Sequence, residues 1–147
     1  MAMRTKEFIS RLDHDRIVQA IRDAERRTSG EIRVYLQRGE LKKDVLTLAQ
    51  ERFHRLGMHE TNARNGVLIF VAPRVHQFAV VGDEAIHQRC GNELWEAVVA
   101  KMREHFRSER FSDAIVDATH DIGEVLARHF PRQSGDTNEL PDRVEGE

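Results

Sequence analysis

The residue types best suited to chemistry meet at one edge of a predicted β-hairpin in the middle of the chain. Two apolar runs, 67–72 and 76–81, are joined by a turn that centres near Arg74. Antiparallel pairing about that turn places Gly66 opposite Gly82. The polar residues that flank these glycines, Asn65 and Asp83, then lie at the same edge of the sheet. We expect the functional site at this edge.

Carboxylates follow the second strand of this hairpin and predict a metal site. Asp83 and His87 lie four residues apart on a predicted helical turn, so they face the same way, and Glu84 lies beside them. Asn65 approaches from across the hairpin with an amide oxygen. Such oxygen ligands favour Ca²⁺ or Mg²⁺, whereas zinc would depend on the histidine. The alternative is that Asp83 only caps the helical turn and His87 only faces solvent.

Other residues at this edge suit an anionic substrate. The guanidinium of Arg64 can hold a phosphate through two parallel hydrogen bonds, and Asn65 lies next to it. Gly66 and Gly82 allow a substrate to approach the backbone closely, or they only satisfy tight strand ends. Arg64 can equally be an ordinary surface residue. No residue in the sequence is a convincing nucleophile, so the catalytic residues stay unknown.

Four other candidates are weaker. The run Asp13-His14-Asp15 has the letters of an aspartyl-phosphate motif, but it precedes a helix rather than following a strand, so we predict that Asp13 is a helix cap. Cys90 lacks the arginine of a Cys-x5-Arg phosphatase loop, because position 96 is Glu. His59 and His76 flank the hairpin and suit a ligand or a general acid, or they are solvated loop histidines.

Composition limits the class of protein. The 147 residues carry a formal net charge of −2 and no long basic run, which argues against nucleic-acid binding. A single cysteine rules out disulfides within the chain and fits a reducing compartment. No segment approaches the roughly 20 apolar residues of a membrane span, and the N-terminus lacks the apolar core of a signal peptide. We expect a cytoplasmic protein that does not itself span a membrane.

Hydrophobic periodicity predicts the elements that position this edge. A helix begins after Asp13 and stops at Gly30, which we expect in the left-handed conformation. Residues 31–36 alternate as a strand covered on one side or near an edge. A second helix ends at Gly57. After the hairpin come a helical turn that ends by Gly91 and two amphipathic helices, over 95–106 and 111–126, with Trp95 in the core.

This order predicts a three-layer α/β/α sandwich around a small mixed sheet. The strand–helix–strand unit is a parallel crossover, and the third strand pairs antiparallel to the second. The near-continuous apolar character of the hairpin strands indicates a sheet covered on both faces. We assign residues 1–130 to one domain, opening with an amphipathic lead-in at 8–12, and residues 131–147 to a disordered acidic tail.

Three segments together resemble the TPM domain family. They are Thr28-Ser29-Gly30-Glu31-Ile32-Arg33-Val34, Asn65-Gly66-Val67-Leu68-Ile69 and Val81-Gly82-Asp83. The resemblance spans about residues 8–130 and implies an α/β/α fold. It also implies divalent-cation binding near the strand ends and weak acid-phosphatase activity of the kind found in a plastid member. Family members are often tethered by a signal peptide and a membrane helix, which we do not find in this sequence.

Two functions follow as expectations. The first is a divalent-cation-binding domain with weak phosphomonoesterase activity, in which Asp83, Glu84, Asn65 and His87 hold Ca²⁺ or Mg²⁺. Arg64, Asn65, Gly66 and Gly82 would then contact the substrate. The second is a non-enzymatic interaction module that assists a membrane-protein complex, as other members of the family do.

Overall fold

The computed structural model describes residues 14–72, 75–108, 110–132 and 144–146, without the side chains of residues 92–94 and 144–146. The predicted lead-in at 8–12, the cap at Asp13 and the turn centre at Arg74 lie outside these residues. The elements are, in order, α2 (His14–Glu25), β1 (Glu31–Leu36), α3 (Val45–Arg55), the short 3₁₀ helix η1 (Met58–Glu60), β2 (Gly66–Ala72), β3 (Gln77–Gly82), α4 (Glu84–Cys90), α5 (Asn92–Arg107), α6 (Phe111–His129) and β4 (Val144–Gly146).

The described strands form one mixed sheet in the order β3-β2-β1-β4. β1 and β2 run parallel, from Glu31 beside Gly66 to Leu36 beside Val71. β2 and β3 form the antiparallel hairpin. Helix α3 connects the two parallel strands. The predicted mixed sheet, with its parallel crossover and antiparallel hairpin, is therefore confirmed.

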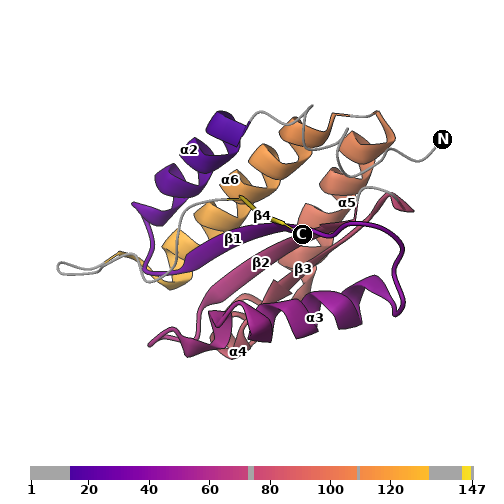
Figure 1. Ribbon diagram of the computed structural model, residues 1–147. Helices are drawn as coiled ribbons and strands as arrows, with labels where there is room; N and C mark the ends of the chain where they lie inside the picture. The colour runs from indigo at the N-terminus through magenta and orange to yellow at the C-terminus, as the bar shows by residue number, and fades with distance from the viewer. Residues whose placement is uncertain (1–13, 73–74, 109, 133–143, 147) are drawn as a thin grey trace.

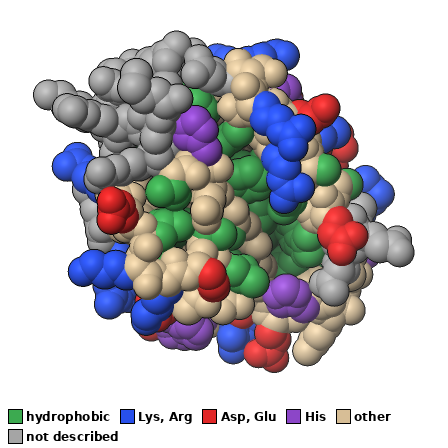
Figure 2. Space-filling view, turned by 90° about the vertical axis from the view of Figure 1, so that its right-hand side faces the viewer, with side chains coloured by type: hydrophobic (Ala, Val, Ile, Leu, Met, Phe, Trp, Pro, Cys, Tyr) green, Lys and Arg blue, Asp and Glu red, His purple; other side chains and the backbone are tan. Residues whose placement is uncertain are grey.

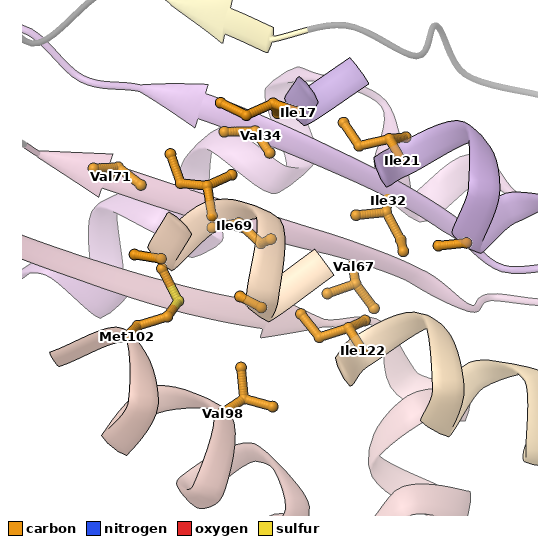
Figure 3. Close-up of a cluster of buried hydrophobic side chains, with 14 of the residues drawn as sticks. Ile17, Ile21, Ile32, Val34, Val67, Ile69, Val71, Val98, Met102 and Ile122 are labelled. Carbon is orange, nitrogen blue, oxygen red and sulfur yellow. The ribbon is translucent and has the colours of Figure 1, made fainter. Parts of the chain in front are cut away.

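Helices cover both faces of the sheet, which makes the predicted three-layer sandwich (Figure 1). On one face, β-strand side chains such as Ile32, Val67 and Ile69 pack against α2, α5 and α6 (Figure 3). On the other face, Leu68 and Phe70 belong to the apolar cluster of α3. Because neighbouring residues of a strand point to opposite faces, two buried faces require a continuous apolar strand. All seven residues of β2 are buried accordingly.

Strand β1 differs from its sequence-based description. Its polar and apolar residues alternate, yet all six are buried, so it is covered on both faces. Arg33 is only 5% exposed and donates from Nη1 to the carbonyl of Leu56 at 3.3 Å. The alternating polar residues that suggested a solvent-exposed face are therefore buried. The contact of Arg33 shows that such a side chain can bond the end of a helix.

The two glycines that the sequence predicted to stop helices, Gly30 and Gly57, have different roles in the structure. Gly57 follows α3 with φ 72°, the left-handed conformation that stops a helix without steric cost. Gly30 does not adopt a positive φ, so the prediction of a left-handed stop there is wrong. Its requirement is space instead: a Cβ at Gly30 would lie 2.9 Å from Cδ1 of Leu126 and 3.2 Å from the carbonyl oxygen of Asn65.

A short segment near the C-terminus joins the sheet. Val144–Gly146 forms β4, parallel to β1, with Val144 beside Val34. Sequence analysis had not assigned a strand there, and tail residues 133–143 and 147 lie outside the described part. Among the described residues, no helix combines the length and the apolar character that crossing a bilayer requires.

Candidate functional site

The hairpin brings the predicted site residues to one edge of the sheet with a register shifted by one residue. Gly82 pairs with Val67, not with Gly66. Gly66 instead accepts a hydrogen bond at its carbonyl from the backbone N–H of Asp83, at 2.9 Å. The expected pairing of Gly66 with Gly82 is therefore wrong by one position. The reason is that the turn residues, and not the apolar runs, set the register of a hairpin.

Arg64 and Asp83 form the central contact of this edge. The carboxylate of Asp83 accepts from Nε of Arg64 at 2.8 Å and from Nη2 at 2.9 Å, so the pair is bidentate. The side chain of Asp83 is 5% exposed, whereas that of Arg64 is 42% exposed. Asp83 also caps α4 by accepting from the N–H of Glu84 at 2.7 Å. The side chain that caps α4 is thus also the carboxylate that the sequence suggested as a metal ligand.

A second carboxylate faces the same guanidinium. Oε2 of Glu84 lies 3.4 Å from Nη1 of Arg64, and the Glu84 side chain is exposed. The hydrogen bond to Asp83, followed by the charges of both acids, raises the pKa of Arg64 above its ordinary value. Arg64, Asp83 and Glu84 are called the edge cluster below. The cluster consists of two carboxylates around one guanidinium group.

Backbone strain accompanies the cluster. Arg64 has φ 53°, in the left-handed region that residues other than glycine rarely adopt. Its carbonyl accepts from the N–H of Ala85 at 3.1 Å, so the strained residue is fixed to the first turn of α4. Strain of this kind persists only where surrounding contacts hold it.

Asn65 is completely buried and directed elsewhere. Its Nδ2 donates to Oγ of Ser29, on the loop before β1, at 3.1 Å. Its Oδ1 is buried and has no hydrogen-bond partner among the described residues. A buried amide oxygen normally accepts at least one hydrogen bond. Asn65 therefore holds an unused acceptor, although its one hydrogen bond goes to Ser29 and not to the edge cluster.

The two glycines of the predicted substrate group have packing roles. A Cβ at Gly66 would lie 3.1 Å from the carbonyl oxygen of Met58. A Cβ at Gly82 would lie 2.8 Å from Cγ2 of Ile86, inside α4. Each glycine allows a neighbouring element to approach the strand end closely, and neither has the positive φ of a tight turn.

The structure places His87 apart from the carboxylate of Asp83. Its backbone N–H bonds the carbonyl of Asp83 at 3.3 Å, but its exposed side chain lines a hollow beside Val80 and Trp95. Within the described part of the chain, no group of three His, Cys, Asp or Glu side chains is placed to hold a metal ion. A cation at this edge would therefore depend on Asp83, Glu84 and neutral oxygen ligands.

The remaining candidates are dispersed. His59 lies in η1 with its ring 4.6 Å from that of His54, and His76 lies at the opposite end of the hairpin. Cys90 is 8% exposed, and burial raises the pKa of its thiol, which disfavours the reactive thiolate. Trp95, which was predicted to lie in the core, is partly buried and packs against it.

Sequence analysis missed the buried polar residues that shape the loop before β1. Glu25 is 4% exposed and accepts from the N–H of Ile32 at 2.8 Å, which joins the end of α2 to β1. Thr28 donates to the carbonyl of Phe130 and accepts from the N–H of Gly30 at 3.0 Å. These contacts fix Ser29, the partner of Asn65. No spacing in the sequence indicates them, because the partners come from separate segments.

Comparisons with known proteins agree with this architecture. The family model described as TPM domain matches residues 3–125. The NMR structure of BA42 protein from the psychrophilic bacterium Bizionia argentinensis is similar at 36% identity and a TM-score of 0.85. That alignment covers 91% of this chain and 92% of BA42. No curated protein matches this chain.

Proposed function

Because this chain belongs to the TPM domain family, as its family match and its 36% identity to BA42 show, we propose that it binds a divalent cation at the edge cluster. Asp83 and Glu84 are the charged ligands. Ca²⁺ and Mg²⁺ are the cations that such oxygen ligands favour. Weak hydrolysis of phosphomonoesters at the same edge is the second part of the proposal.

One observation carries this function: two carboxylates from adjacent residues already surround a positive charge. The guanidinium of Arg64 lies 2.8 Å from Asp83 and 3.4 Å from Glu84. A position that stabilises a guanidinium between two acids also suits a metal cation of higher charge. Asn65, which the sequence also suggested as a ligand, is buried and bonds Ser29, so the proposed site depends on the two carboxylates.

Arg64 competes with the cation for Asp83. Both oxygens of Asp83 accept from Arg64, so cation binding requires that the guanidinium leave. Because 42% of the Arg64 side chain is exposed, it can swing into solvent without disturbing the core. The cost of breaking a bidentate pair lowers the apparent affinity, so we expect weak binding in the unmodified protein.

The displaced Arg64 gives the edge a phosphate ligand. A guanidinium released from Asp83 regains its free donors and can hold a phosphoryl group by two parallel hydrogen bonds. A bound divalent cation would polarise a phosphoryl oxygen and activate water. Arg64 would then orient the phosphomonoester, while Asp83 and Glu84 stay with the cation.

Calorimetric titration with Ca²⁺ and with Mg²⁺ tests the proposal. Asp83→Asn keeps a helix-capping side chain and removes the charge, so we expect it to abolish binding. Arg64→Asn removes the competitor, and asparagine tolerates the left-handed backbone at this position. We expect about tenfold tighter binding in this variant, the gain from losing a charge-assisted pair. The matched control is Asp44→Asn, which alters the capping aspartate of α3 instead.

Two results would contradict the proposal. One is the absence of saturable binding in both the unmodified protein and Arg64→Asn. The other is binding that Asp83→Asn leaves unchanged. Hydrolysis of p-nitrophenyl phosphate then tests the second part. We expect slow turnover that chelation removes and that Arg64→Asn reduces through a higher KM.

The interaction module remains as a second proposed function, with a partner in a membrane-protein complex. The observation in its favour is the apolar edge strand β3 of the described sheet, whose Val80 and Gly82 line a hollow that ends beside α4. Asp83→Asn separates the two functions, because it removes cation binding without altering that edge.

A further inference from the structure

Strand β3 is the open edge of the described sheet. It pairs with β2 on one side, while β4 occupies the opposite edge of the sheet, beside β1. Because the Asp83 N–H bonds the Gly66 carbonyl, the backbone groups of Asp83 and of every second residue before it in β3 point toward β2. Backbone groups alternate along an antiparallel pair, so Phe78, Val80 and Gly82 direct their N–H and C=O groups away from β2. These groups can receive a further strand.

The sequence of β3 lacks the protection usual for edge strands, and no other strand of the described residues pairs with its outer side. The six residues of β3 read Gln-Phe-Ala-Val-Val-Gly, with no charge and no proline. Natural proteins normally block open edges with charges, prolines, bulges or covering elements, since a free apolar edge pairs with other chains. An unprotected edge therefore points to a strand-like partner.

Two hollows run along the same edge, between β3 and α5. The first, of about 380 Å³, is lined by residues that include Phe78, Phe106 and Arg107. The second, of about 390 Å³, is lined by residues that include Val80, Trp95 and Val99. Arg103 lines both, and the two hollows together are called the β3–α5 groove below. Figure 2 shows a hollow floored by apolar side chains on this side of the molecule, with basic side chains above it.

We propose that the β3–α5 groove binds an extended segment of a partner protein, which adds to β3 as a further strand. Its backbone would bond the outward groups of Phe78, Val80 and Gly82. Alternate side chains of an added strand point to one face of the sheet, so apolar residues at every second position would enter the two hollows. This inference specifies the surface used by the second proposed function and is independent of cation binding.

Charge complementarity determines the rest of the partner segment. Arg103 and Arg107 are exposed along the groove, and Glu96 is the acidic residue among the lining side chains. The excess of positive charge favours a segment with Asp or Glu between its apolar residues.

A second copy of this chain fits the groove less well. Edge-to-edge pairing of two β3 strands would bring the partner's own α5 to the side of the sheet where α5 already lines the groove. A peptide segment carries no such helix. It therefore fills the space beside β3 without a clash between helices.

The experiment is selection from a displayed library of random 12-residue peptides on the full chain, in the presence of chelator. We expect enriched peptides with apolar residues at alternate positions and acidic residues between them. NMR titration of a synthetic enriched peptide should shift the amide signals of Phe78, Val80 and Gly82 most strongly. These three signals distinguish strand addition from adhesion to a helix face.

Variants test the two parts of the interaction separately. Val80→Pro removes an outward N–H donor that β2 does not use, so we expect peptide binding to be lost. Arg103→Glu should weaken binding by roughly tenfold or more, as expected for reversal of an interface charge. Arg22→Glu, on exposed α2, is the matched control and should change nothing. If Val80→Pro does not fold, Arg103→Glu carries the test.

Three outcomes would overturn the inference: no shared pattern among the selected peptides, NMR shifts that lie away from β3, or binding that Arg103→Glu leaves intact. A concentration-dependent dimer that is broken by Val80→Pro would assign the groove to a second copy instead. Asp83→Asn should bind the peptide as the unmodified protein does. Failure of this inference is thus distinguishable from failure of cation binding.

Discussion

At the residue scale, the side chain of Asp83 makes contacts with two different elements. It caps α4 through the N–H of Glu84 and holds Arg64 through both oxygens. A buried carboxylate without such partners would be strongly disfavoured. Arg64 supplies that partner to the acidic group that we propose as a cation ligand.

A different ion pair makes acid stability testable at this scale. Asp113, in α6, accepts from Arg110 at 3.0 Å and from Arg16 of α2 at 3.1 Å, and these hydrogen bonds lower the pKa of its carboxyl group. A lowered folded-state pKa gives stability that is present above the unfolded value, near 4, and is lost as the pH falls through the folded value.

We therefore expect Asp113→Asn to lower Tm at pH 6 by more than it does at pH 3. Thermal melts of both proteins across this range measure the difference. The control is Asp23→Asn, an exposed acid on α2 whose partners are local. A Tm difference that stays constant with pH would show that Asp113 contributes no charge-dependent stability.

At the element scale, the contact between α2 and α6 depends on one glycine. A Cβ placed on Gly123 of α6 would lie 2.6 Å from the Cβ of Ala24 in α2. Both residues are buried within the apolar cluster that joins these helices to the sheet. The absence of a side chain at Gly123 sets how closely the two helices approach.

We expect Gly123→Ala to destabilise the fold by about 1–3 kcal/mol, the usual cost of inserting a methyl group into a packed core. Intrinsic helix propensity alone would favour alanine over glycine, by up to about 1 kcal/mol. Urea unfolding measures the free energy, with exposed Glu124→Ala as the control on the same helix. A stabilised Gly123→Ala protein would mean that α2 and α6 move apart at little cost.

At the scale of the whole molecule, the sheet is closed at one edge by β4 and open at the other along β3. β4 consists of three residues paired to β1, from Val144 to Gly146. So short a strand adds little buried surface, but it covers backbone groups of a buried strand. The two edges therefore differ in their availability to a partner.

Removing residues 133–147 should test that arrangement. We expect Tm to fall by no more than about 4 °C, equivalent to roughly 1 kcal/mol in a domain of this size. Hydrogen exchange should accelerate at the amides of Val34 and Leu36, which face β4, while Ile69 of β2 serves as the internal control. Unchanged exchange in β1 would show that β4 does not protect that edge in solution.

The sequence by itself determined the element order, the three layers and the polar edge at Asp83. Hydrophobic periodicity and helix caps are local properties of the sequence. A strand that is buried on both faces also has a recognisable sequence, a continuous apolar run such as that of β2. It also carried the resemblance to the TPM domain family, which the comparisons confirm over residues 3–125. Contacts between neighbours in the chain, such as the cap of α4, follow from the same local signals.

Only the tertiary structure decided which side chains meet. It set the hairpin register one residue from expectation, paired Arg64 with Asp83, and directed Asn65 to Ser29. It also buried Arg33 and left the β3 edge open. These are contacts between segments that are distant in the chain, and the packing of separate elements determines them. Residue spacing describes one element at a time, so it cannot specify them.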